Sequence, residues 1–408
     1  SSIMYDTTAF NLTMMYGLDA VTVQENIQKN IKKWEPLKAK INVEKDALIW
    51  AVNGHDDRSV AFAARLMELG VEVRIIDKNA LLSEQSLPRG SVVVIDMDNP
   101  DYQDLSSVIS SVASGLDLSV VSISSGFGAE ELPDWGGRHF RLLERPQIAL
   151  MGHRDFSSYD VGVSWWSLDH HLGIRHSMIN GSSLNYGDLR RYNTIIMPSG
   201  YLNLSNSEMN SLKEWVRQGG TLIAHNASSR SLSYENGIGS VRQISGTFDK
   251  SEEYNMDLQR EFGALNIEID MQKTNKNKVD YNVEYPWDGS SNKYNKAQLE
   301  KRDKWQSLFM PSGAFVAGRI DDEHWLTFGA IDTIPVLYSN LPVLMTGGNS
   351  EAAVRIGEIV QSNEESYRTI NWSDMPPNTD LNVRMSGLVW PEASQRIANS
   401  AYLTRERI

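Results

Sequence analysis

The chain has 408 residues, of which 52 are acidic and 39 basic, and its formal net charge is −13. Binding of nucleic acid needs a concentrated Lys/Arg face, so this charge disfavours that class of partner. The absence of cysteine excludes disulfides, thiolate catalysis and cysteine-bound zinc, and no apolar run approaches the ~20 residues of a membrane-spanning helix.

Residues 1–45 form a lead-in, in which the Lys-rich stretch 24–40 predicts a linker or a surface helix. Residues 46–145 then alternate between apolar runs and helix patterns. The runs at 47–52, 71–76, 91–96 and 119–123 predict strands, and the intervening patterns predict helices through 60–67 and 105–112. Because this alternation is typical of parallel βαβ units, we expect a small three-layer α/β domain over 46–145.

The same rhythm starts again at residue 146. Strands are predicted at 147–152, 174–179, 194–198 and 221–224, with helices over 163–172 and 205–218. Ser205 stands three residues before Glu208, which is the spacing of a capping box. The order and the short connections predict a second three-layer α/β domain over 146–345, with a parallel, flavodoxin-like sheet.

Residues 235–310 break this rhythm, since Asn, Lys, Tyr and Gly dominate, and we expect an irregular insertion there. Two further strands are predicted at 313–320 and 324–331, joined by the acidic turn Asp321-Asp322-Glu323. The C-terminal segment, 346–408, is rich in loop signals from residue 365 onward. Its stretch 394–404 fits either a helix or a strand.

The strongest functional signal lies at residues 219–229, where two glycines end a helix and a buried strand runs into a small-residue turn. In an α/β sheet this junction displays a nucleophile. Here the apex falls on Asn226, whose amide nitrogen is not a usable nucleophile. One interpretation is a scaffold that kept the turn without the reaction; the other is a nearby hydrolytic nucleophile, Ser228 or Ser229, assisted by His225.

Histidines and aromatic residues are the other site candidates in the sequence. None of the eight histidines has a Glu three residues later, so no metal ligands are predicted, although His153 follows a strand at the ligand-binding edge of the sheet. The aromatic residues fit either core packing or a platform for a peptide or a glycan. They are Tyr159, Trp165, Trp166, Tyr285, Trp287 and Trp305.

Three stretches together resemble one family. Residues 5–10 (Tyr-Asp-Thr-Thr-Ala-Phe), followed by Met15-Tyr16-Gly17, resemble the sequence that closes the catalytic domain of large bacterial zinc carboxypeptidases, which are carboxypeptidase A-like. The span 146–226 resembles the class I glutamine amidotransferase-like domain that follows the peptidase in those proteins. Residues 386–392 and 396–403 resemble their C-terminal region.

The resemblance implies a chain cut from an exported, periplasmic or secreted metallopeptidase. The family's zinc ligands and catalytic Glu would precede Ser1, so zinc is expected only in that upstream peptidase domain, which would be a partner of this region. In class I glutamine amidotransferases a Gly-x-Cys-x-Gly turn carries the thiolate, where this chain has Ala224-His225-Asn226-Ala227-Ser228. Amidotransferase activity is therefore not implied.

We expect a non-catalytic accessory region that supports the peptidase or binds a peptide or glycan, with no cofactor of its own. Its ligand-binding candidates are His153, His225, Asn226 and Ser228. The alternative is a small serine-type hydrolase that uses Ser228 or Ser229 with His225 or His153. A third hypothesis is assembly through the insertion, around residues 270–300.

Overall fold

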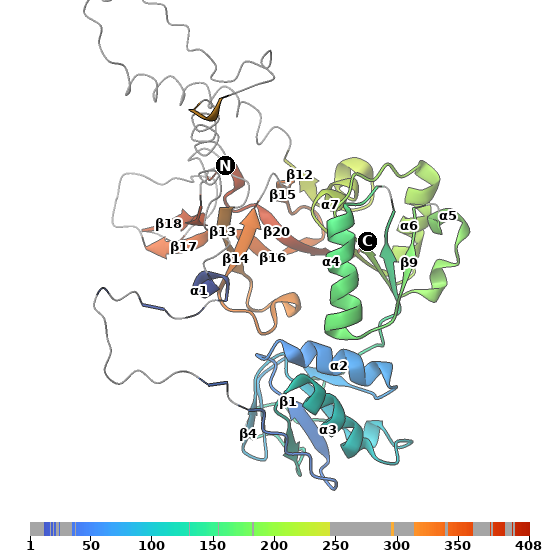
Figure 1. The fold of residues 1–408 in the computed structure, drawn as a ribbon, viewed down its shortest axis with the longest axis vertical. Helices are drawn as coiled ribbons and strands as arrows, with labels where there is room; N and C mark the ends of the chain where they lie inside the picture. The colour runs from blue at the N-terminus through green and yellow to red at the C-terminus, as the bar shows by residue number, and fades with distance from the viewer. Residues whose placement is uncertain are drawn as a thin grey trace, which may run out of the picture.

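The structure is a computed structural model. The residues it describes are 12–16, 18, 20–21, 24, 35–36, 38–129, 131–153, 155–181, 183–244, 295–297, 314–338, 342–361, 376, 378–387, 394 and 396–408. Within them, helices accompany one parallel sheet and several antiparallel ones, which bears out a mixed α and β chain. We refer to residues 38–145 as the first unit, 146–241 as the parallel unit and 242–408 as the antiparallel unit (Figure 1).

The sheet of the first unit is antiparallel throughout, so the prediction of parallel βαβ units over 46–145 is wrong. Its five strands, in spatial order, are β6 (Val121–Ile123), β1 (Ile49–Val52), β5 (Val92–Ile95), β2 (Arg74–Ile76) and β7 (Phe140–Leu142). Each strand–helix–strand connection skips one strand, because β5 lies between β1 and β2 and β1 lies between β5 and β6. This is the split βαβ arrangement of ferredoxin-like folds.

Both faces of the first sheet are covered. Helices α2 (Arg58–Glu68) and α3 (Leu105–Leu116) share a core with Trp50 and Val94 on one face. The hairpin of β3 (Ala80–Leu82) and β4 (Gln85–Leu87) packs on the other face. The first unit therefore has three layers, with helices on only one side.

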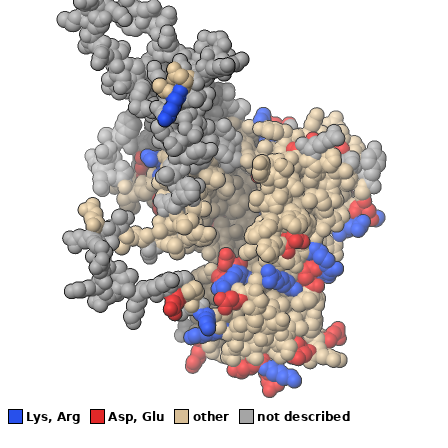
Figure 2. Space-filling view, in the orientation of Figure 1, with Lys and Arg blue, Asp and Glu red and all other residues tan. Residues whose placement is uncertain are grey.

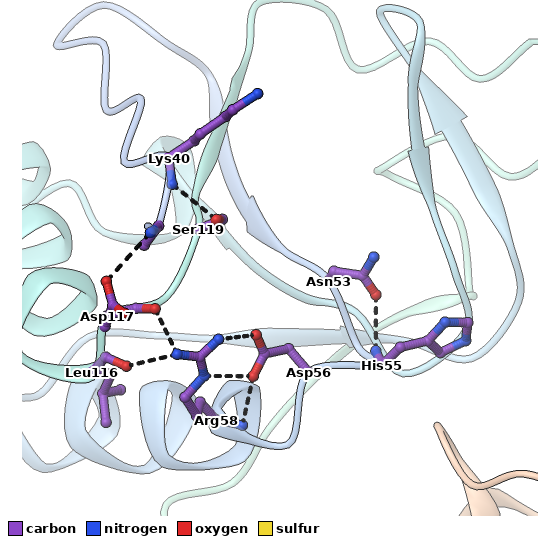
Figure 3. A network of polar contacts seen from close by, with 9 residues as sticks. Lys40, Asn53, His55, Asp56, Arg58, Leu116, Asp117 and Ser119 are labelled. Carbon is purple, nitrogen blue, oxygen red and sulfur yellow. Dashed lines mark hydrogen bonds and ion pairs between the residues drawn. The ribbon is translucent and has the colours of Figure 1, made fainter. Parts of the chain in front are cut away.

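Arg58, at the start of α2, holds the end of α3 (Figure 3). Its Nη1 donates to the carbonyl oxygens of Leu116 and Asp117 at 3.4 and 2.7 Å, where a cation also complements the helix dipole. Its Nε and Nη2 donate to the two carboxylate oxygens of Asp56 at 2.8 and 2.6 Å. These bonds fix the start of α2 to the end of α3.

Residues 38–44 run beside the edge strand β6, in parallel orientation at the Ile41–Val120 bridge. The backbone N–H of Lys40 donates to the Ser119 hydroxyl at 2.9 Å, as Figure 3 shows. Ile41 and Val43 also pack against the first core. The end of the predicted lead-in thus belongs to the first unit, while helix α1 (Leu12–Met15) contacts the antiparallel unit at β14 (Thr333–Tyr338).

The predicted parallel direction of the second sheet is confirmed. Its strands, in spatial order, are β11 (Thr221–Ala224), β10 (Thr194–Met197), β8 (Ile148–Met151) and β9 (His176–Ile179). Its helices before β11 are α4 (Ser158–Trp166), which continues as a π-helix over Ser167–Leu172, α5 (Ser183–Tyr186) and α6 (Asn206–Arg217), and α7 (Ala227–Ser231) follows β11. The predicted helix end at Gly173 is present, with φ at 72°.

The capping box of α6 is present as predicted, since the Ser205 side chain accepts from the backbone N–H of Glu208 and the Glu208 carboxylate accepts from the N–H of Ser205. Ser205→Ala is expected to lower the free energy of unfolding by ~1 kcal/mol, because orphan N–H groups lose an acceptor. Urea denaturation measures this loss. Asn210→Ala, at an exposed site on the same helix, is the control; an equal loss there would contradict the capping account.

Helix α2 packs on two sheets at once. The alternating side chains of the parallel strands point to opposite faces, and one face packs on α5 and α6 through Leu184, Leu212 and Trp215. The other face, which includes Leu150 and Ile196, packs against Leu168 and against Ala64 of α2. The first unit therefore supplies part of the layer that covers the parallel sheet (Figure 1).

Ion pairs surround this contact, and charged side chains gather where the two units meet in Figure 2. Glu68 of α2 accepts from Arg145 Nη2 at 3.0 Å and from Arg175 Nε at 2.8 Å. Burial alone would raise the pKa of Glu68, but the hydrogen bonds from Arg175 and the charges of both arginines outweigh it. The pKa of this carboxyl is therefore lower than its ordinary value of 4.5.

The stabilisation from Glu68 is expected to be complete above pH 4.5 and to disappear as the pH falls through the lower folded-state pKa. In Glu68→Gln this part of the acid-induced loss of stability should be missing. Urea denaturation at a series of acidic pH values measures it. The exposed Glu72 provides the control variant Glu72→Gln; identical pH profiles for the two variants would exclude Glu68 as the titrating group.

The antiparallel unit is a seven-stranded sheet within the described residues. Its strands, in spatial order, are β12 (Arg242–Gln243), β15 (Leu344–Met345), β20 (Ala401–Glu406), β16 (Ser350–Ile356), β13 (Ala314–Ile320) and β14, with β19 (Arg384–Ser386) also paired to β13. Strands β17 (Glu358–Gln361) and β18 (Thr379–Asn382) form a separate hairpin.

The antiparallel unit differs in part from what the sequence predicts for residues 235–408. Strands β13, β14 and β15 pair with β16, β20 and one another instead of the parallel sheet, so the predicted boundary at 345 divides a single sheet. The stretch 394–404 contains both possibilities, with helical residues at 396–397 followed by strand β20. The predicted insertion, 235–310, lies outside the described residues except for 235–244 and 295–297.

The predicted strand at 324–331 is absent, and the partner of β13 is β14 instead. His324 begins a 3₁₀ helix over Trp325–Thr327, and its Nδ1 accepts from the N–H of Leu326 at 3.1 Å. The loop then docks on the first unit, where the Arg89 guanidinium lies 4.3 Å from the centre of the Phe328 ring. In this stretch His324 therefore caps a short helix, and Phe328 contacts the first unit.

Candidate functional site

The candidate site lies at the carboxyl ends of the parallel strands, where open α/β sheets bind ligands. The segments that meet this edge are Gly152-His153 after β8, residues 198–200 after β10, and His225-Asn226 after β11. The N–H of Ser157, just before α4, donates to Ser199 O at 2.8 Å and joins the first two segments. Phe156 and Gly200 add a bridge between them.

The sharp turn after β11 is present, and Asn226 is its apex. The backbone of Asn226 has φ 48° and ψ −119°, and α7 (Ala227–Ser231) starts at the next residue. Such angles cost a residue with a side chain about 1–3 kcal/mol and persist only where neighbouring structure enforces them. Here the N–H of His225 donates to Met197 O at 2.9 Å, and the N–H of Ser229 donates to Asn226 O at 3.0 Å.

Ser228 is held inside the turn and does not face solvent. Its exposed fraction is 0%, and its Oγ donates to Pro198 O at 2.5 Å, with Gly200 O at 3.4 Å. The hydroxyl therefore fastens the start of α7 to the loop after β10. Ser229 is also engaged, because its Oγ donates to Asn226 O at 2.5 Å.

The two candidate histidines are near this edge, but neither completes a triad in the described residues. Burial lowers the pKa of His225, although the charge of Asp160 acts in the opposite direction, and the net shift favours the neutral imidazole. His153 is exposed and has φ 119°. The hydroxyls of Ser228 and Ser229 both donate to backbone carbonyls, so no hydrogen bond prepares either one for proton transfer to a histidine.

A surface pocket of about 460 Å³ opens beside the apex, between the loop after β10 and α7. It is lined by Tyr201, Leu202, Asn203, Leu204, Asn206, Met209, Ala227, Arg230 and Ser231. Sequence reasoning missed Tyr201, Asn203 and Arg230. The available signal was their position, since Tyr201 and Asn203 lie between a predicted strand end and the capping box of α6.

Four aromatic side chains of the parallel unit are largely exposed. Tyr201 is 83% exposed and Tyr159, in the first turn of α4, is 86% exposed. Trp165 and Trp166 of α4 are 43% and 52% exposed, so they are not core residues. The insertion aromatics Tyr285, Trp287 and Trp305 lie outside the described residues.

In the described ranges, no three His, Asp or Glu side chains converge in a way that could hold a metal ion. Among the helices of those same ranges, none combines the length and the apolar character needed to cross a bilayer. The chain matches no protein-family model, no curated protein and no solved structure.

Proposed function

We propose that this chain is a non-catalytic binding region of a longer metallopeptidase, and that its parallel unit binds a peptide or a glycan in the pocket beside Asn226. The observation that carries the proposal is the apex itself. A strained turn of the kind that displays nucleophiles presents a carboxamide, and the nearest buried hydroxyl, that of Ser228, is bonded to backbone carbonyls.

The fold of the parallel unit supports this assignment. Its strand order, which is 2-1-3-4 when the strands are numbered along the chain, is that of flavodoxin-like sheets. The resemblance of span 146–226 to glutamine amidotransferase-like domains agrees with that order and with a turn after β11. The same resemblance supports an exported parent protein whose zinc and peptidase residues are in the upstream domain.

The lining of the pocket supports the choice of ligand. Asn203 and Asn206 provide amide donors and acceptors that match hydroxyl or peptide groups, and Tyr201 offers an exposed ring face. Arg230 adds a cation at the α7 side. A few polar groups beside an aromatic ring are typical of sites for neutral, polar chains such as oligosaccharides and peptides.

A titration tests the binding role directly, with N-acetylglucosamine oligomers and a tri-alanine peptide as probes and calorimetry as the measurement. Tyr201→Ala is expected to weaken binding by about tenfold, or 1.4 kcal/mol. Tyr234→Ala, at an exposed site outside the pocket lining, is the matched control. Equal affinities for the two variants, or no binding by the wild-type chain, would exclude this role for the pocket.

The alternative is a serine-type hydrolase that uses Ser228 or Ser229 with His225 or His153. It would require Ser228 to leave its buried bonds with Pro198 O and Gly200 O. Turnover of a nitrophenyl ester by the wild-type chain, lost in Ser228→Ala or Ser229→Ala, would establish it in place of the binding role. We expect both variants to leave any background turnover unchanged.

A further inference from the structure

Two arginines of the antiparallel unit face each other across neighbouring strands. β13 and β16 pair in antiparallel register with Arg319 directly opposite Arg355, and both side chains are half-buried. The two strands lie side by side in Figure 1. Like charges in directly opposite positions destabilise a sheet, so this pair needs a compensating group.

Both guanidinium groups are held in place by neutral oxygens. Arg319 Nη1 donates to Gly357 O at 3.1 Å and its Nη2 to Asn399 Oδ1 at 2.9 Å. Arg355 Nη1 donates to Asn399 O at 3.3 Å and its Nη2 to Thr346 Oγ1 at 3.1 Å. These bonds orient the two groups, but they leave other N–H donors on each group and neutralise neither charge.

Among the described residues, neither Arg319 nor Arg355 forms an ion pair with a carboxylate. Other arginines do, as Arg74 pairs with Asp98 at 2.6 Å and Arg405 with Glu351 at 3.3 Å. Burial lowers the pKa of Arg319, and the charge of Arg355 lowers it further. Within the described part of the chain, two adjacent, half-buried cations thus share no carboxylate partner, which favours a bound anion as their counter-charge.

We propose that Arg319 and Arg355 together bind one small oxyanion, either a phosphate or the carboxylate of an organic acid. Guanidinium groups bind both kinds of anion through paired N–H donors, and a shared anion would replace repulsion between the strands with attraction. The site lies on a different sheet from the pocket beside Asn226. This proposal is therefore independent of the proposed peptide or glycan binding.

The test is a thermal denaturation series of the whole chain with inorganic phosphate or succinate, at ionic strength matched with sodium chloride. Wild type is expected to show saturable stabilisation by at least one of these anions beyond the chloride series. The anion with the lower dissociation constant identifies the source as phosphate or carboxylate. In Arg355→Gln that affinity should fall by about tenfold or more.

The control variant is Arg405→Gln, which also removes one cation from this sheet but leaves the Arg319–Arg355 pair intact. It should keep the wild-type affinity. Equal affinities in Arg355→Gln and Arg405→Gln would overturn the proposal, as would the lack of saturable stabilisation in wild type. If Arg355→Gln does not fold, Arg355→Lys keeps the charge without the forked donors, and wild-type affinity in that variant would equally overturn the proposal.

Discussion

Replacing Ala64 by Glu is expected to separate the first unit from the parallel unit. Ala64 of α2 is 5% exposed and packs in a cluster that includes Leu150 and Ile196 of the parallel unit. A carboxylate in that apolar contact would be buried without a compensating charge, which costs about 3–5 kcal/mol. We expect the parallel sheet to unfold at a lower urea concentration, and its amide hydrogens to exchange faster.

The control for Ala64→Glu lies one turn earlier on the same helix. Val60 is 58% exposed, so Val60→Glu introduces the same charge on α2 without placing it between the units. Its denaturation profile should match that of the wild type within about 0.5 kcal/mol. If Ala64→Glu behaves like Val60→Glu, the contact between α2 and the parallel sheet contributes little to stability.

Trp215→Ala is expected to cost about 3–5 kcal/mol, which is the range for removing a large aromatic side chain from a core. Trp215 of α6 is 6% exposed, and its Nε1 donates to Leu189 O at 3.0 Å. A Cβ on Gly220, the residue before β11, would lie 2.5 Å from its ring. The indole therefore leaves room only for glycine at this position. Circular dichroism in a urea series measures the loss.

Trp166→Ala provides the matched control for Trp215→Ala. It removes the same side chain from the same unit, but Trp166 is 52% exposed on α4. We expect a loss below about 1 kcal/mol. Comparable losses for the two variants would show that α4 is covered in solution by something other than water.

The parallel unit was predictable because its local signals agree with one another. Strands β8 and β10 are apolar runs that become buried on both faces, and Ser205 with Glu208 marks the start of α6. Gly219 and Gly220 then end that helix before β11. The position of the apex follows from the same pattern, because β11 ends at Ala224 and small residues follow Asn226.

In the first unit, the alternation of strand and helix patterns does not show which strands are neighbours in the sheet. A strand–helix–strand pattern has the same periodicity whether the two strands are neighbours or have a third strand between them. Here β5 inserts between β1 and β2, so four of the five strands and both helices were predicted near their true positions, but the strand directions and the edge strand β7 were not. The hairpin β3–β4 was also missed, because its turn uses Ser83 and Glu84 at positive φ in place of the usual Gly or Asn.

For the candidate site, the sequence predicts which residues lie at the sheet edge but not the contacts that their side chains make. His153, His225 and Asn226 all lie at the expected sheet edge, but the burial of Ser228 depends on Pro198 O and Gly200 O, which are distant in sequence. The pocket beside Asn226 likewise forms from two segments, 201–209 and 227–231. No local pattern in either segment indicates that they meet.

The double packing of α2 sets an order of events during translation. Ribosomes deliver the chain from its N-terminus, so α2 and its own sheet leave the exit tunnel before β8, β10 and β11 exist. We therefore expect the nascent parallel sheet to find one of its covering helices already folded. A circular permutant that moves residues 38–145 to the C-terminal end would expose Leu150 and Ile196 until synthesis finished, and it should aggregate more during expression than the natural order does.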